Sequence, residues 1–375
     1  MPKYAIEFTG GRKIASTMRT LPQPQLRNAT ASLTRHGDTA RRRDYLRRFT
    51  PTPHTCDLQV MQRTIRLETN REAVLELART FFRAHRHEPA TEPGFLWRIV
   101  CEPDPNLEYP ALPFSAFSES GLRYVSIGQR GFMAVDLGNR EAVAYFSDRF
   151  LDADAKFRYR PPLDTLLCLT AAPLGLTILS AGCVSLKDRG ILVLGPPNSG
   201  KTTACYIAAK DDLEFQADQV VFLDRRNKDH RNNNRPENNH GGNTLQAWGD
   251  ALPAVFRPET VNYLPELRET TRCSTYDDLS FFYFDKTPMQ PRWARPVIPI
   301  CSVFLNRDAL RKELRRLLSE EAAVRMQSSV LFQEDARFDS EITASLAMLM
   351  EKPVYELNYP GDPNIAATVI KDLLR

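Results

Sequence analysis

The chain has 375 residues, of which 42% are hydrophobic and 26% are charged. These proportions are close to those of average globular proteins, and they exclude a wholly disordered or fibrous chain. The length corresponds to about two or three domains of roughly 150 residues each. We therefore expect a folded protein with at least one sizeable hydrophobic core.

The formal net charge of +4 is unevenly distributed along the chain. Between Gly11 and Thr50 there are ten basic and two acidic residues, spread among Ser, Thr, Pro and Gln. Residues 1–54 are therefore predicted to be a basic, poorly ordered leader, the alternative being an arm that contacts an anionic partner. Because the basic excess is confined to this leader, nucleic acid is not expected as a partner.

The seven cysteines are scattered, and no two have the spacing of a CxxC pair. This pattern indicates neither a disulfide scaffold nor a zinc ribbon. The N-terminus lacks the apolar core of a secretory signal. A reducing cytoplasm is the expected location.

Residues 55–150 are predicted to form a small α+β domain. Apolar residues alternate through 58–67, which predicts strands, and they recur at helical spacing between Arg71 and His85. Three short β-rich runs follow, and turn residues with glycine separate them, so we expect an antiparallel meander. These runs lie at 122–127, 131–137 and 142–146.

The uncharged stretch 165–186 is long enough to be flagged as a membrane span. A proline and a glycine interrupt it, and another apolar run follows almost at once. We therefore predict no membrane span but a buried helix followed by a hairpin. The hairpin would consist of one strand over 178–186, a turn at 187–190 and a strand over 191–194.

The second half, 151–375, alternates strands with helices, which is typical of an α/β or α+β nucleotide-binding core. The region 225–243 is rich in Asn, Arg and His, and it is predicted to be a mobile surface loop. We expect strands at 280–285, 301–305 and 353–357, and helices at 307–326, 339–350 and 364–374.

One motif points directly to chemistry. The run Gly195-Pro196-Pro197-Asn198-Ser199-Gly200-Lys201-Thr202 matches G-x-x-x-x-G-K-[ST], and it lies between a predicted strand and a predicted helix. Glycines let backbone N–H groups turn toward a polyphosphate, and the helix N-terminus adds its positive dipole end. Lys201 is expected to reach the β- and γ-phosphates and the Thr202 hydroxyl to bind Mg²⁺. The alternative is a structural glycine turn with an incidental lysine.

Asp218 stands at the start of the next apolar run, 219–223. A carboxylate at that position can face the phosphate site, where it would hold the metal or accept a proton from a substrate hydroxyl. The alternative is a residue that caps its own turn.

The segment 180–223 resembles the catalytic core of the HPr serine kinase/phosphorylase family and its serine-kinase-like relatives. The family's phosphate-binding loop corresponds to Gly195–Thr202, its hairpin glycine to Gly190 and the first aspartate of its Asp-Asp pair to Asp218. The resemblance extends from about residue 164 onward and weakens after the segment. It implies a P-loop core that binds ATP and Mg²⁺, with Asp218 as a catalytic residue.

Three positions depart from the family pattern. Ser180 stands where the family has a hairpin histidine, Gln219 where it has the second aspartate, and Thr203 where an acidic residue usually follows the loop. The resemblance therefore implies that residues 195–203, the last of which is Thr203, bind ATP. It does not imply phosphorylation of HPr, and it does not imply phosphorolysis.

Two function classes compete. The leading hypothesis is an ATP-dependent, kinase-like enzyme whose acceptor is a protein serine or a small molecule, and the second is a nucleotide-binding regulator or scaffold without catalysis. A motor or translocase is disfavoured because no second acidic strand motif with a catalytic Glu follows. Self-association is compatible with the sequence. Candidates for the acceptor site or for γ-phosphate contact are Trp248, Arg257, Arg292 and Arg295.

Overall fold

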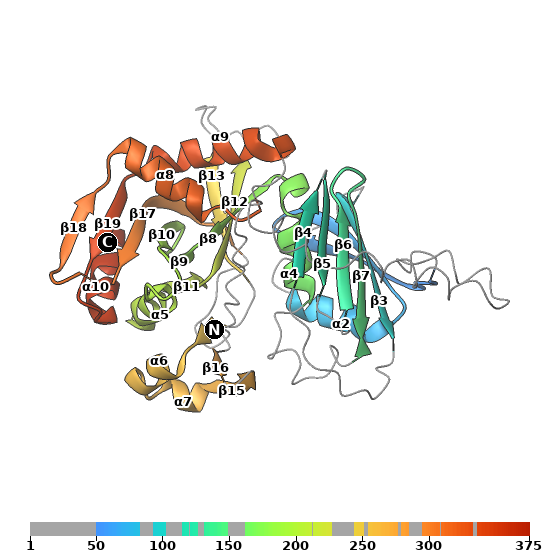
Figure 1. Cartoon of the computed structure of the whole chain (residues 1–375), viewed down its shortest axis with the longest axis horizontal. Coiled ribbons are helices and arrows are strands. Elements are labelled where there is room, and N and C mark those ends of the chain that lie inside the picture. The colour runs from blue at the N-terminus through green and yellow to red at the C-terminus, as the bar shows by residue number, and fades with distance from the viewer. Residues whose placement is uncertain are drawn as a thin grey trace, which may run out of the picture.

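The computed structural model describes residues 50–82, 93–102, 115–119, 121–126, 131–148, 162–211, 213–226, 244–250, 254–276, 279–284, 295–307, 309–332 and 336–375. The structure is mixed α/β and has two halves that lie side by side (Figure 1). One half is built on a seven-stranded sheet, and the other on a six-stranded sheet with two three-stranded sheets beside it. The predicted leader up to residue 49 and most of the predicted loop at 225–243 lie outside the described residues.

The seven-stranded sheet contains the strands and the meander predicted for the first half. Its strand order is β1-β2-β3-β7-β6-β5-β4, with parallel pairing at β2–β3 and β3–β7 and antiparallel pairing elsewhere. The strands are β1 (His54–Val60), β2 (Arg63–Thr69), β3 (Phe95–Glu102), β4 (Ser115–Glu119), β5 (Leu122–Ser126), β6 (Gly131–Asp136) and β7 (Glu141–Ser147).

Two helices cover one face of this sheet. They are α2 (Glu72–Phe81), which connects β2 to β3, and α4 (Pro162–Thr170), which lies on the side facing the other half (Figure 1). Alternate residues of the strands, such as Trp97 and Met133, join Leu166 of α4 in one cluster and have no exposed surface. The period-2 pattern of the sequence therefore becomes one buried sheet face.

The six-stranded sheet carries the predicted motif. Its order is β11-β9-β10-β17-β19-β18, and the central strands β10, β17 and β19 are parallel. The strands are β9 (Gly182–Leu186), β10 (Arg189–Leu194), β11 (Glu214–Ala217), β17 (Ile298–Asn306), β18 (Glu313–Arg316) and β19 (Val354–Asn358). Helices α5 (Lys201–Asp211) and α10 (Pro363–Leu374) pack on one face, where a hydrophobic cluster joins them to the sheet.

The opposite face of this sheet is covered by another layer. It contains the sheet β13-β12-β8, made of β8 (Leu176–Ser180), β12 (Val220–Arg226) and β13 (Thr244–Trp248), and the helices α8 (Ser319–Ser329) and α9 (Asp339–Met350). The third sheet, β14-β16-β15, lies near α6 and α7. Its elements are β14 (Ala254–Phe256), α6 (Pro258–Tyr263), α7 (Leu267–Thr270), β15 (Thr271–Tyr276) and β16 (Leu279–Phe284).

The prediction of one strand over 178–186 was wrong. The chain forms β8, leaves the strand at Ala181 and enters β9 in a different sheet, with the Ala181 amide donating to the Gln219 carbonyl at 3.1 Å. The run is uncharged throughout and its residues are almost all buried, so its pattern contains no clear signal for the change of sheet. In the part of the chain that the structure describes, no helix has the length and apolarity needed to cross a bilayer.

The prediction of one helix over 307–326 was also wrong. The first part forms the edge strand β18, and α8 begins only at Ser319. The leucines that suggested an apolar helix face do not share one: Leu310 is 97% exposed and Leu318 76%, whereas Leu317 is buried. Backbone pairing of β18 with β19 decides the conformation here, and it overrides the helical spacing.

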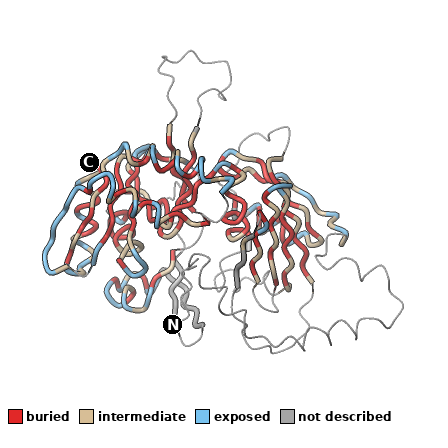
Figure 2. Tube along the Cα trace, turned by 45° about the horizontal axis from the view of Figure 1, so that its top comes forward, coloured by how far each residue is buried: buried red, intermediate tan, exposed pale blue. Residues whose placement is uncertain are grey.

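The two halves share a hydrophobic cluster. Ile178 of β8, Phe222 of β12 and Trp248 of β13 pack with α4 and with the inner face of the seven-stranded sheet. Figure 2 shows buried residues running through both halves. An ion pair also joins the two halves. Both terminal nitrogens of Arg63, in β2, donate to the carboxylate of Asp224, in β12, at 2.8 Å.

Candidate functional site

The predicted strand, loop and helix are all present around the G-x-x-x-x-G-K-[ST] motif. The last four residues of β10 have no exposed surface, and β9 and β17 pair with the strand on either side. The chain leaves β10 after Leu194, turns through 195–200 and enters α5 at Lys201. The backbone N–H groups of the first turn of α5 therefore face the end of the loop.

The loop conformation requires its glycines. Gly195 has a φ of 139° and Gly200 a φ of 90°, both in the region that residues with a Cβ avoid. A Cβ on Gly195 would lie 2.8 Å from the Leu305 carbonyl oxygen, and one on Gly200 would lie 2.6 Å from the Tyr359 hydroxyl. Asn198, with a φ of 69°, adopts the left-handed conformation that asparagine tolerates.

Lys201 lies folded back onto the loop. Its Nζ donates to the carbonyl oxygens of Gly195 at 2.7 Å and Pro196 at 3.0 Å. Burial lowers the pKa of this ammonium to about 8, and the nearby Cys205 and Asp218 act in the opposite direction. A partly desolvated ammonium that has only neutral carbonyl partners would gain from an anionic phosphate.

Asp218 is next to the start of the helix, as predicted. It lies in the turn between β11 and β12, is 1% exposed, and accepts a hydrogen bond of 3.4 Å from the Thr202 hydroxyl. A carboxylate and a hydroxyl are the hard oxygen ligands that Mg²⁺ takes, usually one or two from the protein, with phosphate and water completing the shell. Among the described residues there is no group of three or more His, Cys, Asp or Glu that could hold a metal ion.

Two of the three positions that the sequence comparison singled out, Ser180 and Gln219, are close to Asp218. Ser180, at the end of β8, pairs with Val220 of β12, and Gln219 is the residue between Asp218 and that pair. The structure therefore brings Ser180, Asp218 and Gln219 together. None of the three is an imidazole.

Ser199 and Thr203 complete the motif. The Ser199 Oγ is buried and has no hydrogen-bond partner among the described residues. Thr203 points toward α6, where its hydroxyl lies 3.3 Å from that of Thr260. An orphaned hydroxyl inside the loop is what a ligand with hydrogen-bonding oxygens would satisfy.

Tyr359 supports the loop, and the sequence analysis missed it. Its ring is fully buried after β19, and its hydroxyl donates to the Ser199 carbonyl at 2.7 Å. The position of Tyr359 in the chain could have indicated this contact. Residues that directly follow parallel strands lie together at one edge of the sheet. Tyr359 follows β19 just as Gly195 follows β10.

A Tyr359→Phe variant should remain folded and bind a nucleotide more weakly. The ring still fills its place, but the Ser199 carbonyl loses its donor, which costs about 1 kcal/mol of stability. The loop then samples other conformations, and we expect a Kd roughly five times higher, because part of the binding free energy is spent on ordering the loop. Calorimetric titration with Mg-ATP measures this. The nearby Tyr355→Phe variant is the control, and equal affinities for wild type and Tyr359→Phe would exclude the supporting role.

The remaining candidates lie in different parts of the fold. Trp248 is a core residue, 1% exposed. Arg257 is exposed and precedes α6. Arg295, another candidate for γ-phosphate contact, lines a cavity with residues of the β9–β10 turn, at the opposite end of β10 from the loop. Arg292 lies outside the described residues.

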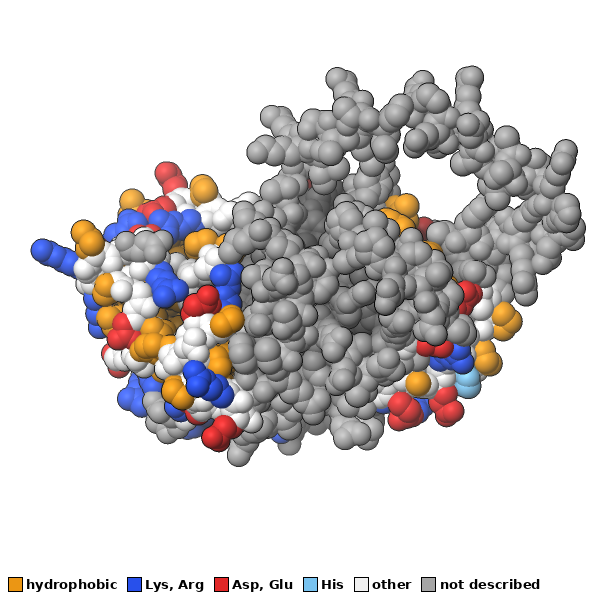
Figure 3. All heavy atoms as spheres, turned by 60° about the horizontal axis from the view of Figure 1, so that its bottom comes forward, with side chains coloured by type: hydrophobic (Ala, Val, Ile, Leu, Met, Phe, Trp, Pro, Cys, Tyr) orange, Lys and Arg blue, Asp and Glu red, His pale blue; other side chains and the backbone are white. Residues whose placement is uncertain are grey.

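The described surface of this half carries mixed charge. In Figure 3, Lys and Arg side chains on this side of the molecule stand among acidic and hydrophobic ones. A nucleic-acid site of the usual kind would need clustered basic residues that follow a phosphate backbone. The described part of this face therefore offers no such stripe.

No family model matches this chain, and no curated protein matches it. Among solved structures, the chain is similar to the Hpr(Ser) kinase/phosphatase from Coxiella burnetii. The two chains are 12% identical, the match covers 52% of this chain and 95% of the other, and the TM-score is 0.26. A similarity this weak does not assign a function, which has to come from the side chains of the loop.

Proposed function

We propose that the chain binds Mg-ATP at Gly195–Thr203 and transfers the γ-phosphoryl group to a hydroxyl acceptor, either a protein serine or a small molecule. The observation that supports this best is the placement of Lys201, Thr202 and Asp218 around one glycine-shaped turn. Lys201 and the backbone amides would hold the phosphates, and Thr202 and Asp218 would hold Mg²⁺. The bound ion would neutralise charge that develops on the phosphoryl oxygens.

Nucleotide binding is tested by a Lys201→Ala variant. A ligand that binds only the folded state raises its stability, by about 2.7 kcal/mol at a hundred times the Kd. We expect millimolar Mg-ATP to raise the melting temperature of the wild type. Removing Lys201 should cost roughly 2–3 kcal/mol of binding, or about 30- to 150-fold in Kd, which abolishes most of the shift.

The matched control is Lys210→Ala, in the same helix. Lys210 is paired with Glu266 on the surface, so its removal should leave the nucleotide-induced shift unchanged. A wild-type protein whose melting temperature does not respond to millimolar nucleotide with Mg²⁺ would contradict the proposal.

The pKa of Lys201 predicts how binding depends on pH. Below about pH 8, Lys201 of the free protein is already protonated. Above about pH 8 its amine is neutral and must take up a proton when an anionic phosphate binds. Nucleotide phosphates have lost their last proton by about pH 7, so only the lysine changes beyond that. The affinity for Mg-ATP should therefore fall above pH 8, by up to about tenfold per pH unit. A calorimetric pH series measures this, and the affinity of the Lys201→Ala variant should be flat over the same range.

A catalytically reduced, nucleotide-binding regulator is the second candidate. It is favoured by Ser180 and Gln219, which replace an imidazole and a second carboxylate beside Asp218. Incubation with radiolabelled ATP and a cell lysate separates the two. Label that appears on a protein or small molecule supports the transferase, whereas saturable nucleotide binding without transfer supports the regulator.

A further inference from the structure

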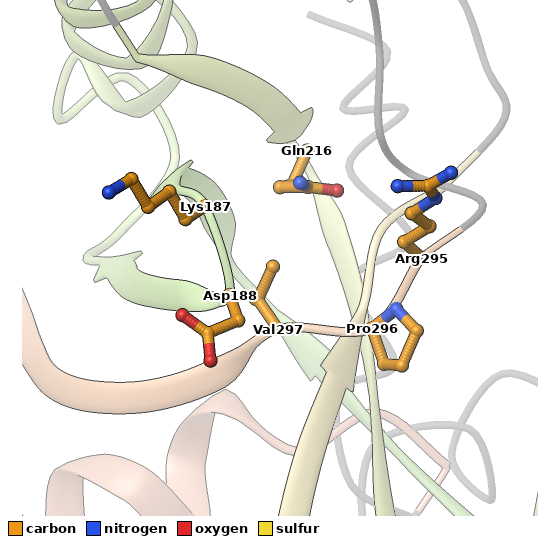
Figure 4. Close-up of a pocket in the computed structure, with 6 residues that line it drawn as sticks. All are labelled: Lys187, Asp188, Gln216, Arg295, Pro296 and Val297. Carbon is orange, nitrogen blue, oxygen red and sulfur yellow. The ribbon is translucent and has the colours of Figure 1, made fainter.

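A second cavity lies at the far end of β10 from the phosphate-binding loop. It has a volume of about 250 Å³ and is open to one side of the β9–β10 turn. Its residues come from that turn, from β11 and from the segment that enters β17 (Figure 4). They are Lys187, Asp188, Gln216, Arg295, Pro296 and Val297.

Gln216 is the buried polar group of this cavity, and the hydrogen-bond network assigns the orientation of its side-chain amide. It is 1% exposed, and its Nε2 lies 2.7 Å from the Ser185 hydroxyl. The Ser185 hydroxyl donates its single proton to the Glu214 carboxylate at 3.1 Å, so toward Gln216 it can only accept. The amide nitrogen must therefore face Ser185, and the amide oxygen must point away from it.

The oxygen that remains has no partner among the described residues. Figure 4 shows it directed across the cavity, toward the side on which Arg295 stands. A buried carbonyl oxygen is unfavourable until a donor reaches it. An occupant of this cavity therefore needs an O–H or N–H group that can point at Gln216.

The other residues that line the cavity indicate which further chemical groups a ligand would need. Arg295 is exposed and offers a planar fork of donors, which suits a carboxylate, whereas the ends of Lys187 and Asp188 extend away from Gln216 (Figure 4). Pro296 and Val297 provide an apolar wall. The cavity is smaller than the roughly 300–1,000 Å³ of sites for drug-sized ligands, so the occupant is small.

We propose that this cavity binds a small carboxylate with a hydroxyl or amino group on the neighbouring carbon. The donor would bond to the Gln216 oxygen while the carboxylate pairs with Arg295, and a short side chain would contact Val297. α-Hydroxy acids and α-amino acids share this chemistry. The site is independent of the nucleotide, because it involves none of the residues assigned to the phosphate-binding loop.

The test uses three ligands of one size and the full chain. Lactate carries the hydroxyl, alanine the amino group, and propionate neither. Ligand-observed NMR titration should show saturable binding of lactate or alanine, and propionate should bind roughly five- to tenfold more weakly, which is the effect of one lost hydrogen bond. Comparing lactate with alanine tells the two ligand sources apart.

Variants assign the effect to the cavity. Gln216→Leu should remove the preference over propionate, and Arg295→Gln, at an exposed position, should weaken all carboxylates without unfolding the chain. Arg311→Gln, another exposed arginine of the same half, is the matched control and should change nothing. The proposal is overturned if none of the three ligands binds, if propionate binds as well as the tighter of lactate and alanine, if inorganic phosphate competes equally, or if Arg311→Gln has the effect of Arg295→Gln. Failure of nucleotide binding would leave these outcomes unaffected.

Discussion

An Asp218→Asn variant is expected to transfer phosphate about 10²- to 10⁴-fold more slowly than the wild type, the usual contribution of a general base. Asn keeps the size of the buried side chain and the contact with Thr202, but it has neither a negative charge for Mg²⁺ nor a site for the acceptor's proton. Nucleotide affinity should fall much less, since Lys201 and the backbone amides remain. A transfer assay on the acceptor that becomes labelled in lysate measures the rate.

The neighbouring position gives the complementary variant. Gln219→Asp restores a second carboxylate beside Asp218 and is expected to raise the transfer rate. Phosphorolysis should be absent from the wild type, because it requires activated inorganic phosphate and the Ser180 hydroxyl does not titrate near neutral pH. Equal rates for wild type and Asp218→Asn would remove Asp218 from the mechanism, and pyrophosphate formed from phosphoprotein and phosphate would refute the loss of phosphorolysis.

Replacing Arg63 with alanine should destabilise the protein by about 3–5 kcal/mol, because it removes a guanidinium that donates two hydrogen bonds to a buried carboxylate. Asp224 is 1% exposed and accepts both terminal nitrogens of Arg63 at 2.8 Å. The same guanidinium donates to the Leu174 and Met61 carbonyls, so these lose a partner as well. Urea unfolding measures the free energy of unfolding.

A matched control comes from the same strand. Arg66 pairs with Asp57, but these side chains are 41% and 30% exposed, and such a pair is worth about 0–1 kcal/mol. In the Arg63→Ala background, Asp224→Asn should recover part of the loss, since the buried charge is removed. An Arg63→Ala loss no larger than that of Arg66→Ala would show that the pair does not hold the two halves together.

Much of the candidate site could be predicted because its signals are contiguous in the chain. A strand, a glycine-bearing loop and a helix start follow one another within 191–211, so local conformational rules suffice. The position of Asp218 came from the resemblance to a family and from the strand that follows it. The meander of the first half could also be predicted from the sequence, since turn residues separate segments in which apolar and polar residues alternate.

Errors arose where the pattern was locally ambiguous. The run 178–186 is uncharged throughout, and its pattern does not mark Ala181 as the point where the chain changes sheets. In 307–318 the leucines at helical spacing do not form a helix, because residues 313–316 form the edge strand β18, which pairs with β19 in an extended conformation. Periodicity describes which residues are apolar, and it does not say which neighbour will cover them.

The sequence by itself determined the strand, the glycine-bearing loop and the helix start at Lys201 and Thr202, because that conformation is encoded locally. Only the tertiary structure decided what surrounds the loop. Tyr359 supports it from 160 residues away, and Arg63 reaches Asp224 across 161 residues. The orientation of the Gln216 amide likewise follows only from the tertiary structure, which places Ser185 and Glu214 beside it. Such contacts depend on which strands become neighbours, and that is settled by burial of the whole chain rather than by any one segment.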